Sequence, residues 1–370
     1  MDPPRPRTGY PPMPRQGSRG PDGNARPNSR HVAARAGVSV GTVSNVLNRP
    51  DLVAPATREK VEAVMREMGF VRNASARQLR MGRSQTVGLL VLDIVGPYFT
   101  AVAKGVEQRM AEAGFVLMLC SSDRDPQTEE RQLAQLEEHG VSGILIAPST
   151  TNLAQVDGVR SRGTPVVLLD QPSPDAGRCS VAVDDVKGAA MAAHHLLEQG
   201  HRRIALINGP EHIQQAADRR RGLHQAVARA GLDVGDLVEE VVVPALVASE
   251  GEHAVGLLMS EQQPPTAIMC VNDLVALGAL RGLHARGLRV PEDVALIGYD
   301  DVEFASVLAP ALTSVRRPKH EFGRRAAELL LEEIDPGVGH SHQQVMFQPE
   351  LIVRGSTDPS QGGTRRASNR

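Results

Sequence analysis

A run of small and hydrogen-bonding side chains lies between Ser39 and Asn48. If the run is helical, Val43 and Leu47 share one face and point inward together with Val38. The outward face then carries Val40, Gly41, Thr42, Ser44 and Asn45. Such a face is poor at packing against another protein layer, but it can contact base edges in the major groove of DNA. An ordinary helical hairpin is the alternative interpretation.

Polar side chains also follow a series of short apolar runs. They are Asp93, Ser122, Asp123, Asp170, Asn208, Asn272, Asp273, Asp300 and Asp301. The same loops carry the aromatic residues Tyr98, Phe99, Tyr299 and Phe304. If the runs are parallel strands, these groups meet beyond the carboxyl ends, where such sheets bind ligands. They predict a cleft for a small polyhydroxylated or heterocyclic molecule, although any single aspartate there could merely cap a helix.

One segment contains candidate catalytic residues. His195, Glu198 and His201 have a spacing that could suggest a metal-dependent hydrolase. Gly200 should end the helix before His201, so the three groups would not share a helical face. The sequence shows neither a glycine-rich phosphate loop nor a nucleophile elbow. The three cysteines are widely spaced, which indicates neither a disulfide framework nor a zinc site, and we expect them to be buried. We therefore expect no enzymatic activity, no metal and no cofactor.

The helices that carry the polar face can be placed from local signals. Residues 28–48 read as two short helices joined by a tight turn, in which Gly37 supplies a left-handed position and Ser39 caps the second helix. A third helix is predicted over 56–68. Residues 73–80 can also be helical, but an isolated helix needs roughly 12 to 15 residues in water. This segment should therefore be unstable until something docks it.

From Thr86 onward the chain alternates short apolar runs with helical stretches. The runs include TVGLLVL, FVLMLC, GILIAP and PVVLLD in a first series, and RIALING, VEEVVV, AIMCV and VALIGYD in a second. Runs of this kind are typical of parallel strands that helices cover on both faces. The predicted fold class is α/β, with two doubly wound parallel-sheet subdomains after an all-α helix-turn-helix.

Charge is unevenly divided along the chain. Residues 1–85 hold 15 Lys and Arg against 6 Asp and Glu, whereas the whole chain has a net charge of −2. A basic front on an acidic body indicates that only the front meets a polyanion. Residues 1–27 and 358–370 are expected to be a disordered basic arm and a disordered tail. Without a signal peptide or a membrane-length apolar run, we expect a cytoplasmic protein without membrane contact.

Several motifs, in the same order, resemble those of the LacI family of bacterial transcription regulators. They are AGVSVGTVSNVLN, TREKVEAVMREMGF, NASARQLR, GHRRIALINGP, VNDLVALGAL and VALIGYDD. The match covers residues 28–357. The resemblance implies a homodimeric repressor that binds a near-palindromic operator in double-stranded DNA, and a small effector, a carbohydrate or related metabolite, that controls this binding.

The resemblance also implies a domain order. A helix-turn-helix headpiece would occupy 28–72, a hinge helix 73–83, and a core similar to periplasmic sugar-binding proteins 84–357. Lobe 1 of the core would cover about 84–184 and 315–343, and lobe 2 about 185–314 and 344–357.

Roles for single residues follow from the same resemblance. Positions that read bases in the family are occupied by Val40, Gly41 and Asn45, and positions that mostly hold phosphates by Ser39, Thr42, Ser44 and Asn48. Leu79 falls on the hinge leucine that inserts into the minor groove. Arg219, Asn272 and Asp300 fall on ligand-facing positions, and Asp93, Phe99 and Asp170 are expected to line the same cleft.

The sequence departs from the family pattern in the headpiece. His31 stands where an aspartate is usual, and Ala54 replaces the serine that usually caps the third helix, a loss that costs about 1 kcal/mol. Two other classes remain as alternatives. A solute-binding protein would share the core but not the headpiece, and a metal-dependent hydrolase would use His195 and His201.

Overall fold

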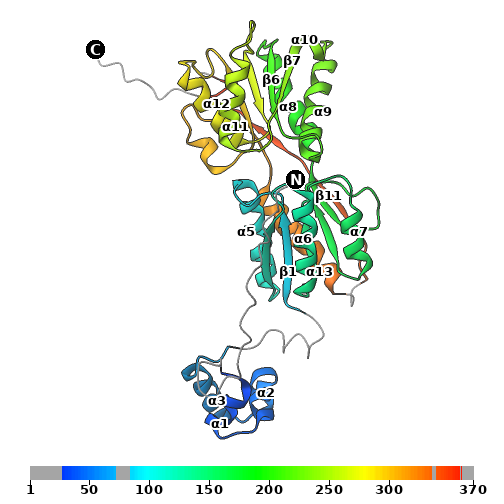
Figure 1. Cartoon of the computed structure of the whole chain (residues 1–370), viewed down its shortest axis with the longest axis vertical. Coiled ribbons are helices and arrows are strands. Elements are labelled where there is room, and N and C mark those ends of the chain that lie inside the picture. The colour runs from blue at the N-terminus through cyan, green and yellow to red at the C-terminus, as the bar shows by residue number, and fades with distance from the viewer. Residues whose placement is uncertain (1–26, 72–83, 336–338, 359, 361–370) are drawn as a thin grey trace, which may run out of the picture. The chain divides into compact units, whose positions relative to one another are not determined.

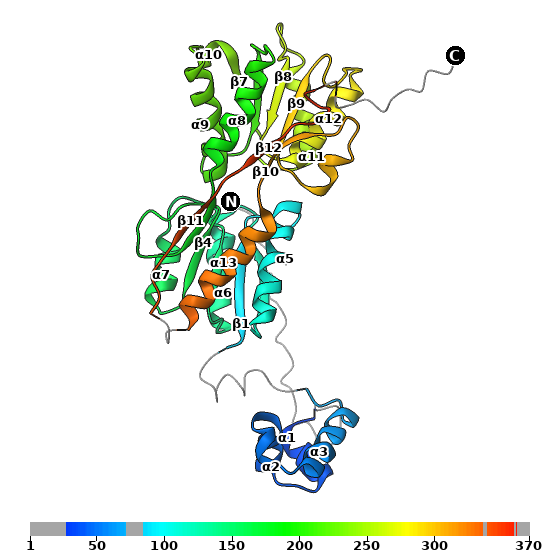
Figure 2. The ribbon, with the colours of Figure 1, turned by 180° about the vertical axis from the view of Figure 1, so that it is seen from behind.

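The computed structural model describes residues 27–71, 84–335, 339–358 and 360 of the chain. It divides near residue 80 into two compact units, a helical headpiece and an α/β core. Figures 1 and 2 show the elements of each unit from two sides. The expected hinge helix with Leu79 lies outside the described residues, as do nearly all of the N-terminal arm and most of the C-terminal tail. Among the described residues, no helix combines the length and apolar character needed to cross a membrane.

The headpiece contains the predicted helix-turn-helix. Its elements are α1 (Ser29–Ala36), α2 (Val40–Asn48), the short 3₁₀ helix η1 (Pro50–Leu52) and α3 (Pro55–Glu67). Gly37 adopts the left-handed conformation between α1 and α2, with φ of +64°, and the Ser39 side chain caps α2. Three helices thus enclose a small core of Val32, Ala33, Ala36, Val43, Val46 and Val61.

Two details of the headpiece differ from a simple helical repeat or from the family pattern. Val46 is the second buried residue of α2, and Leu47, which we expected to be inward, is only half-buried. Val43 and Val46, three positions apart, both belong to the headpiece core, and Leu47 packs against that core while partly exposed. His31 accepts a hydrogen bond from the Asn28 N–H while Asn28 caps α1, so this histidine completes a capping box. As expected, Ala54 provides no side-chain cap for α3.

Two six-stranded sheets form the core. The first has the order β11-β5-β4-β3-β1-β2 and the second β12-β10-β9-β8-β6-β7. The strands are β1 (Thr86–Val91), β2 (Val116–Ser121), β3 (Ile144–Ile146), β4 (Val166–Leu169), β5 (Ser180–Val183), β6 (Ile204–Asn208), β7 (Val238–Val242), β8 (Ala267–Cys270), β9 (Ala295–Asp300), β10 (Thr313–Arg316), β11 (Gln344–Phe347) and β12 (Glu350–Ile352). Pairing is parallel except between β10 and β12. The two parallel-dominated sheets confirm the predicted α/β class.

Helices cover both faces of each sheet (Figures 1 and 2). Around the first sheet lie α5 (Pro97–Glu112), α6 (Pro126–Glu138), α7 (Ala154–Ser161) and α13 (Lys319–Ile334). Around the second lie α8 (Asp185–Glu198), α9 (Gln214–Arg229), α10 (Val234–Leu237), α11 (Ala248–Leu258), α12 (Asp273–Ala285) and the 3₁₀ helix η2 (Glu303–Ser306). Separate apolar clusters fill the two sides of each sheet. Each lobe is therefore doubly wound.

The chain passes between the lobes at positions that differ from the expected boundaries. β10 belongs entirely to the second sheet, although we expected lobe 1 to resume at 315. β11 pairs with β5 in the first sheet, although we expected 344–357 to lie in lobe 2. Both strands are only four residues long, so their apolar pattern could not assign them to a sheet. The crossings therefore fall after β5, after β10 and after β11.

Candidate functional site

The outer face of α2 is open to solvent. Val40 is 47% exposed, and Gly41 and Asn45 are exposed as well. A methyl group added at Gly41 would meet, among the described residues, only the Ser39 hydroxyl at 3.5 Å, which is an ordinary contact. The headpiece therefore has no packing requirement for glycine at position 41. A missing side chain on an exposed helix face leaves room for close approach of a partner.

The other polar side chains of this face are tied to the helix itself. Ser39 Oγ accepts the Thr42 N–H at 2.9 Å and lies 2.9 Å from the Thr42 hydroxyl. Asn48 Nδ2 donates to the Ser44 carbonyl at 2.7 Å. These bonds fix the orientation of the side chains at the start and end of α2.

In the core, the strand-end residues converge on one cavity of about 60 Å³. That volume is several times the roughly 10–15 Å³ that one water needs. All six residues with an expected ligand role line the cavity, namely Asp93, Phe99, Asp170, Arg219, Asn272 and Asp300. Six other residues that we expected near this cleft do not line the cavity, namely Ser122, Asp123, Asn208, Tyr299, Asp301 and Phe304. The sequence reasoning missed Arg124, Gln215 and Arg317, which also line it.

Arg317 links the two lobes inside the cavity. It lies between β10 and α13, where the chain crosses, and only 3% of it is exposed. Its guanidinium contacts the Asp170 carboxylate, at the end of β4, and lies 3.4 Å from Asp300 Oδ1, at the end of β9. The ring of Tyr98 packs under the guanidinium at 3.9 Å, and its hydroxyl donates to Asp170 at 3.0 Å. One buried cation thus bridges a carboxylate from each lobe.

Arg219 forms a second buried centre on α9. Its Nη2 lies 3.2 Å from Asp185 Oδ1 and 3.8 Å from Asp300 Oδ1, and its guanidinium stacks 3.7 Å from the centre of the Tyr299 ring. A buried charge needs a partner. The protein itself supplies two carboxylates, so the ligand adds to an existing network.

Burial and the neighbouring arginines shift the pKa of the two carboxyls in opposite directions. Burial raises the pKa of Asp170 and of Asp300 above the usual range, and the guanidinium groups of Arg317 and Arg219 oppose that rise. Both residues also adopt positive φ, +59° for Asp170 and +98° for Asp300. Strained backbone of this kind persists only where the surrounding contacts hold it, and it concentrates at ligand sites.

The remaining lining residues have mixed roles. Asp93 pairs with Arg124 at 3.0 Å. Asn272 caps α12 by accepting the Val275 N–H at 2.8 Å, which is the helix-capping alternative that we had considered for such positions. Gln215 donates to the Asp170 carbonyl at 3.0 Å, and its own Oε1 is buried without a hydrogen-bond partner.

Asp273, at the first position of α12, should make stability depend on pH. Burial, followed by the nearby Asp300 charge, raises its pKa from 3.8 to about 8. Between these values the folded state keeps a proton that the unfolded state has lost, so stability falls as pH rises, by up to about 1.4 kcal/mol per pH unit. Asp273→Asn can still accept the Val302 N–H and donate to Ser314, so it should flatten this slope.

Urea unfolding of the native chain and of D273N at pH 5 and pH 8 measures the effect. Asp236→Asn, at an exposed position, is the matched control. Its free energy of unfolding should change with pH as that of the native chain does. If the free energy of unfolding changes equally between pH 5 and pH 8 in the native chain and in D273N, Asp273 ionises normally in the fold.

The candidate hydrolase residues do not meet. His195 Nε2 lies 2.9 Å from the Thr357 hydroxyl, and His201 Nδ1 lies 2.9 Å from the Thr266 hydroxyl. Each imidazole is thus paired with a different hydroxyl. Among the described residues, His195, Glu198 and His201 do not form a group whose ligand atoms lie close enough together to hold one metal ion.

Two family models match the chain. The model described as bacterial regulatory proteins, lacI family, matches residues 30–73, and the model described as a periplasmic binding protein-like domain matches residues 193–357. The first match contains the helix-turn-helix, and the second contains most of lobe 2 with Arg219, Asn272 and Asp300.

Relatives of known role and structure extend the match to nearly the whole chain. The transcriptional regulator DegA of Bacillus subtilis is 33% identical over 331 residues, which are 89% of this chain and 97% of the relative. The ribose operon repressor of Escherichia coli K12 is 34% identical over 329 residues, 88% of this chain and 98% of that protein. The lac repressor dimer, solved with its operator and an anti-inducer, superposes with a TM-score of 0.78 at 26% identity, over 90% of this chain and 99% of the repressor. The chain therefore belongs to the LacI family and is a DNA-binding transcription regulator.

Proposed function

We propose that the chain acts as a repressor, as a homodimer on a near-palindromic DNA operator, and that a small neutral sugar bound between the core lobes controls this binding. The observation that carries the proposal is the exposed face of α2, where Gly41 is not needed by the fold. In this proposal Val40, Gly41 and Asn45 read bases, while Ser39, Thr42, Ser44 and Asn48 hold phosphates. Leu79, outside the described residues, inserts into the minor groove. A regulator of this kind works in the cytoplasm and has no catalytic role.

Gly41→Ala separates a DNA contact from a structural one. Alanine is the better helix former by about 1 kcal/mol at an exposed position, so the headpiece should become slightly more stable. The added methyl group projects from the face offered to DNA, so operator affinity should fall at least about tenfold. Thermal unfolding and fluorescence anisotropy with operator duplex measure the two effects.

The salt dependence of the same titration tests the electrostatic part of the proposal. Phosphates that pair with the Arg and Lys residues of the basic N-terminal quarter release counterions, so the affinity of the native chain should fall steeply between about 50 and 200 mM salt. A chain that starts at Ser84 should lose DNA binding. Affinity that does not change with salt, or full binding by the shortened chain, would contradict a DNA-binding headpiece.

The charge pattern of the cavity supports a neutral effector. Each arginine of the lining already has a carboxylate partner: Arg124 has Asp93, Arg219 has Asp185, and Arg317 has Asp170. A phosphate or carboxylate ligand would have to displace one of these buried pairs, whereas sugar hydroxyls can add to them by donating and accepting hydrogen bonds. Asp93, Phe99, Asp170, Arg219, Asn272 and Asp300 are the proposed contacts. The sugar named for the ribose operon repressor makes ribose the first probe.

A thermal-shift screen of ribose, other neutral sugars, sugar phosphates and nucleosides tests whether the effector is a neutral sugar. A ligand at 100 times its dissociation constant adds roughly 2.7 kcal/mol of stability if it binds only the folded state. We expect stabilisation by a neutral sugar. Stabilisation by sugar phosphates alone would contradict the assignment.

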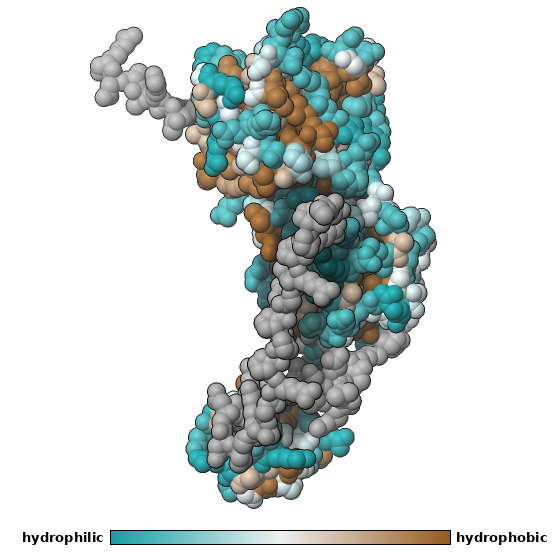
Figure 3. Space-filling view, in the orientation of Figure 1, coloured by the Kyte–Doolittle hydropathy of each residue, from teal (hydrophilic) through white to brown (hydrophobic). Residues whose placement is uncertain are grey.

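The core offers surfaces for a second copy at one edge strand of each sheet, β2 in the first and β7 in the second. Within the described part of the chain, β2 pairs only with β1 and exposes Val116 (66%) and Leu119 (44%), and β7 pairs only with β6 and exposes Val242 (52%). Unprotected edges with apolar side chains usually mark contact with another chain. Figure 3 also shows apolar side chains gathered on one face of the second lobe. These features support the proposed homodimer.

A further inference from the structure

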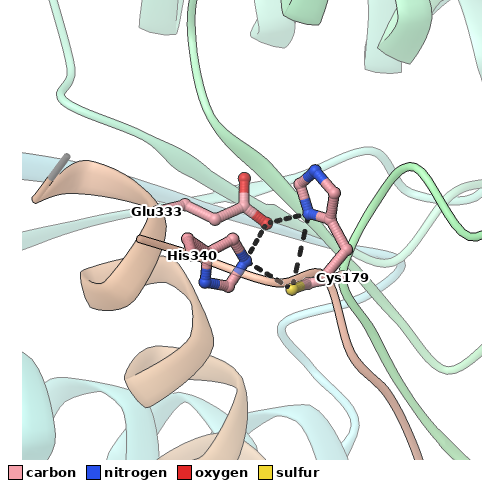
Figure 4. Close-up of side chains that lie close together, drawn as sticks. Cys179, Glu333 and His340 are labelled. Atoms are coloured by element: carbon pink, nitrogen blue, oxygen red, sulfur yellow. Dashed lines mark hydrogen bonds and ion pairs between the residues drawn. The ribbon is translucent and has the colours of Figure 1, made fainter. Parts of the chain in front are cut away.

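A cluster of four potential metal ligands lies in lobe 1, apart from the cavity between the lobes. Cys179 directly precedes β5, Glu333 is near the end of α13, and His340 and His342 lie in the segment that leads into β11. One ligand atom from each residue lies within 4.8 Å of the other three. Figure 4 shows the labelled side chains of Cys179, Glu333 and His340 pointing toward one another.

Four of the six distances between these atoms are close to those of a tetrahedral site. Cys179 Sγ lies 3.2 Å from His340 Nε2 and 3.8 Å from His342 Nδ1. Glu333 Oε1 lies 3.7 Å from His340 Nε2 and 3.4 Å from His342 Nδ1. Ligands bonded tetrahedrally to zinc at its usual N, O and S bond lengths are separated by about 3.3–3.6 Å. A single ion at the centre would therefore require shifts of only a few tenths of an ångström.

The cluster is also hard to explain as ordinary packing. Cys179 is fully buried, and the Glu333 side chain is 8% exposed, with a buried Oε1 that has no hydrogen-bond partner. A buried carboxylate oxygen is costly unless a cation neutralises it, and within the cluster either a protonated imidazole or a metal ion could do so. The His342 side chain, 32% exposed, forms the open side of the cluster and gives an ion a route from solvent.

Two neighbouring groups lie where the outer partners of metal ligands usually lie. The Gln343 N–H donates to Cys179 Sγ at 3.3 Å, and Glu332 Oε2 lies 3.6 Å from His340 Nδ1. A carboxylate on the far nitrogen of a histidine fixes the tautomer that presents the other nitrogen to a metal.

We propose that Cys179, Glu333, His340 and His342 form a four-coordinate site for a divalent transition-metal ion, with Zn²⁺ as the best match. One thiolate, two imidazoles and one carboxylate are all ligands that zinc accepts in tetrahedral sites. The protein fills all four positions, so the site is structural: it ties the end of α13 to β5 and to the segment before β11. Neither the DNA-binding face of α2 nor the sugar cavity is involved.

Binding must release one proton from the thiol. A cysteine binds a metal ion as the thiolate, which is the minor form of a free thiol at neutral pH. The ion replaces that proton and forms a sulfur–metal bond, and metal affinity should therefore rise with pH.

Metal titration of the chelator-treated full-length chain tests the proposal. Competition with a chromophoric chelator should show one Zn²⁺ per chain. Co²⁺ should give the visible bands of a tetrahedral site and a sulfur-to-cobalt charge-transfer band. Cys179→Ser should abolish the charge-transfer band, and His342→Gln should weaken Zn²⁺ binding by at least about tenfold. Glu332→Gln, which leaves all four ligands in place, should weaken it by about 10- to 100-fold.

Matched controls separate the site from general damage. Cys120→Ser removes a half-buried thiol of the same lobe, and His139→Gln removes an exposed imidazole, so both should bind Zn²⁺ like the native chain. His342 is partly exposed, so H342Q keeps the test valid even if C179S fails to fold. The proposal is overturned if the native chain retains no ion in competition with the chelator, or if H342Q binds as tightly as H139Q.

Discussion

Replacing Asn45 with alanine should weaken operator binding by about 2 to 6 kcal/mol per dimer while binding to unrelated duplex DNA stays the same. An asparagine amide that pairs with the donor and acceptor of adenine contributes roughly 1 to 3 kcal/mol of discrimination, and a dimer makes the contact twice. Asn45 is exposed, and alanine favours a helix, so the headpiece should remain folded. Fluorescence anisotropy with operator and with scrambled duplex measures both affinities.

Asn48→Ala is the control for this experiment. Its side chain is expected to hold a phosphate, so its loss should weaken operator and scrambled duplex by similar factors. If Asn45→Ala behaves in the same way as Asn48→Ala, then Asn45 positions the helix and does not read sequence.

Replacing Arg317 with methionine should lower the free energy of unfolding by about 3 to 5 kcal/mol. The substitution keeps much of the side-chain length but leaves the buried Asp170 carboxylate without the cation that contacts it in the fold. Removing one partner of a buried ion pair has a cost of this size because the other charge stays desolvated. Urea unfolding at neutral pH, with the midpoint and slope both fitted, measures the loss.

The neighbouring Arg316 provides a matched control. Its side chain is 47% exposed and pairs with Asp301 and Glu350, so Arg316→Met should cost less than about 1 kcal/mol. Adding Asp170→Asn to Arg317→Met should recover part of the lost stability, because the unpaired charge is then removed. Equal effects of R317M and R316M would show that the bridge between the lobes does not stabilise the fold.

Much of this architecture follows from local patterns. Gly37 and Ser39 mark the turn of the helix-turn-helix. A glycine that can end one helix in the left-handed conformation, followed by a serine that can cap the next helix, predicts a tight turn between two helices. The alternation of apolar runs with helices predicted the two parallel-dominated sheets. Once the strands are parallel, their carboxyl ends meet at one edge, so residues as distant as Asp93 and Asp300 were expected in one cleft, and both line the cavity.

The missed features depend on contacts between distant segments. Arg317 follows an ordinary strand, and its bridge to Asp170 exists only because the chain crosses between the lobes beside it. The thiol of Cys179 meets an imidazole 161 positions later in the chain, so no local spacing could indicate a metal cluster. β11 could not be assigned to a lobe because pairing with β5, and not its own composition, determines its sheet.

Selection of bound sequences from random duplex DNA by the native full-length chain tests the central claim most directly. If the exposed face of α2 reads bases and the chain works as a homodimer, the selected sequences should converge on one near-palindromic site. The same selection with Asn45→Ala should lose the preference at one symmetric pair of positions. Failure of the native chain to enrich any sequence, or enrichment of a site without two-fold symmetry, would contradict the account of a homodimer that reads an operator through α2.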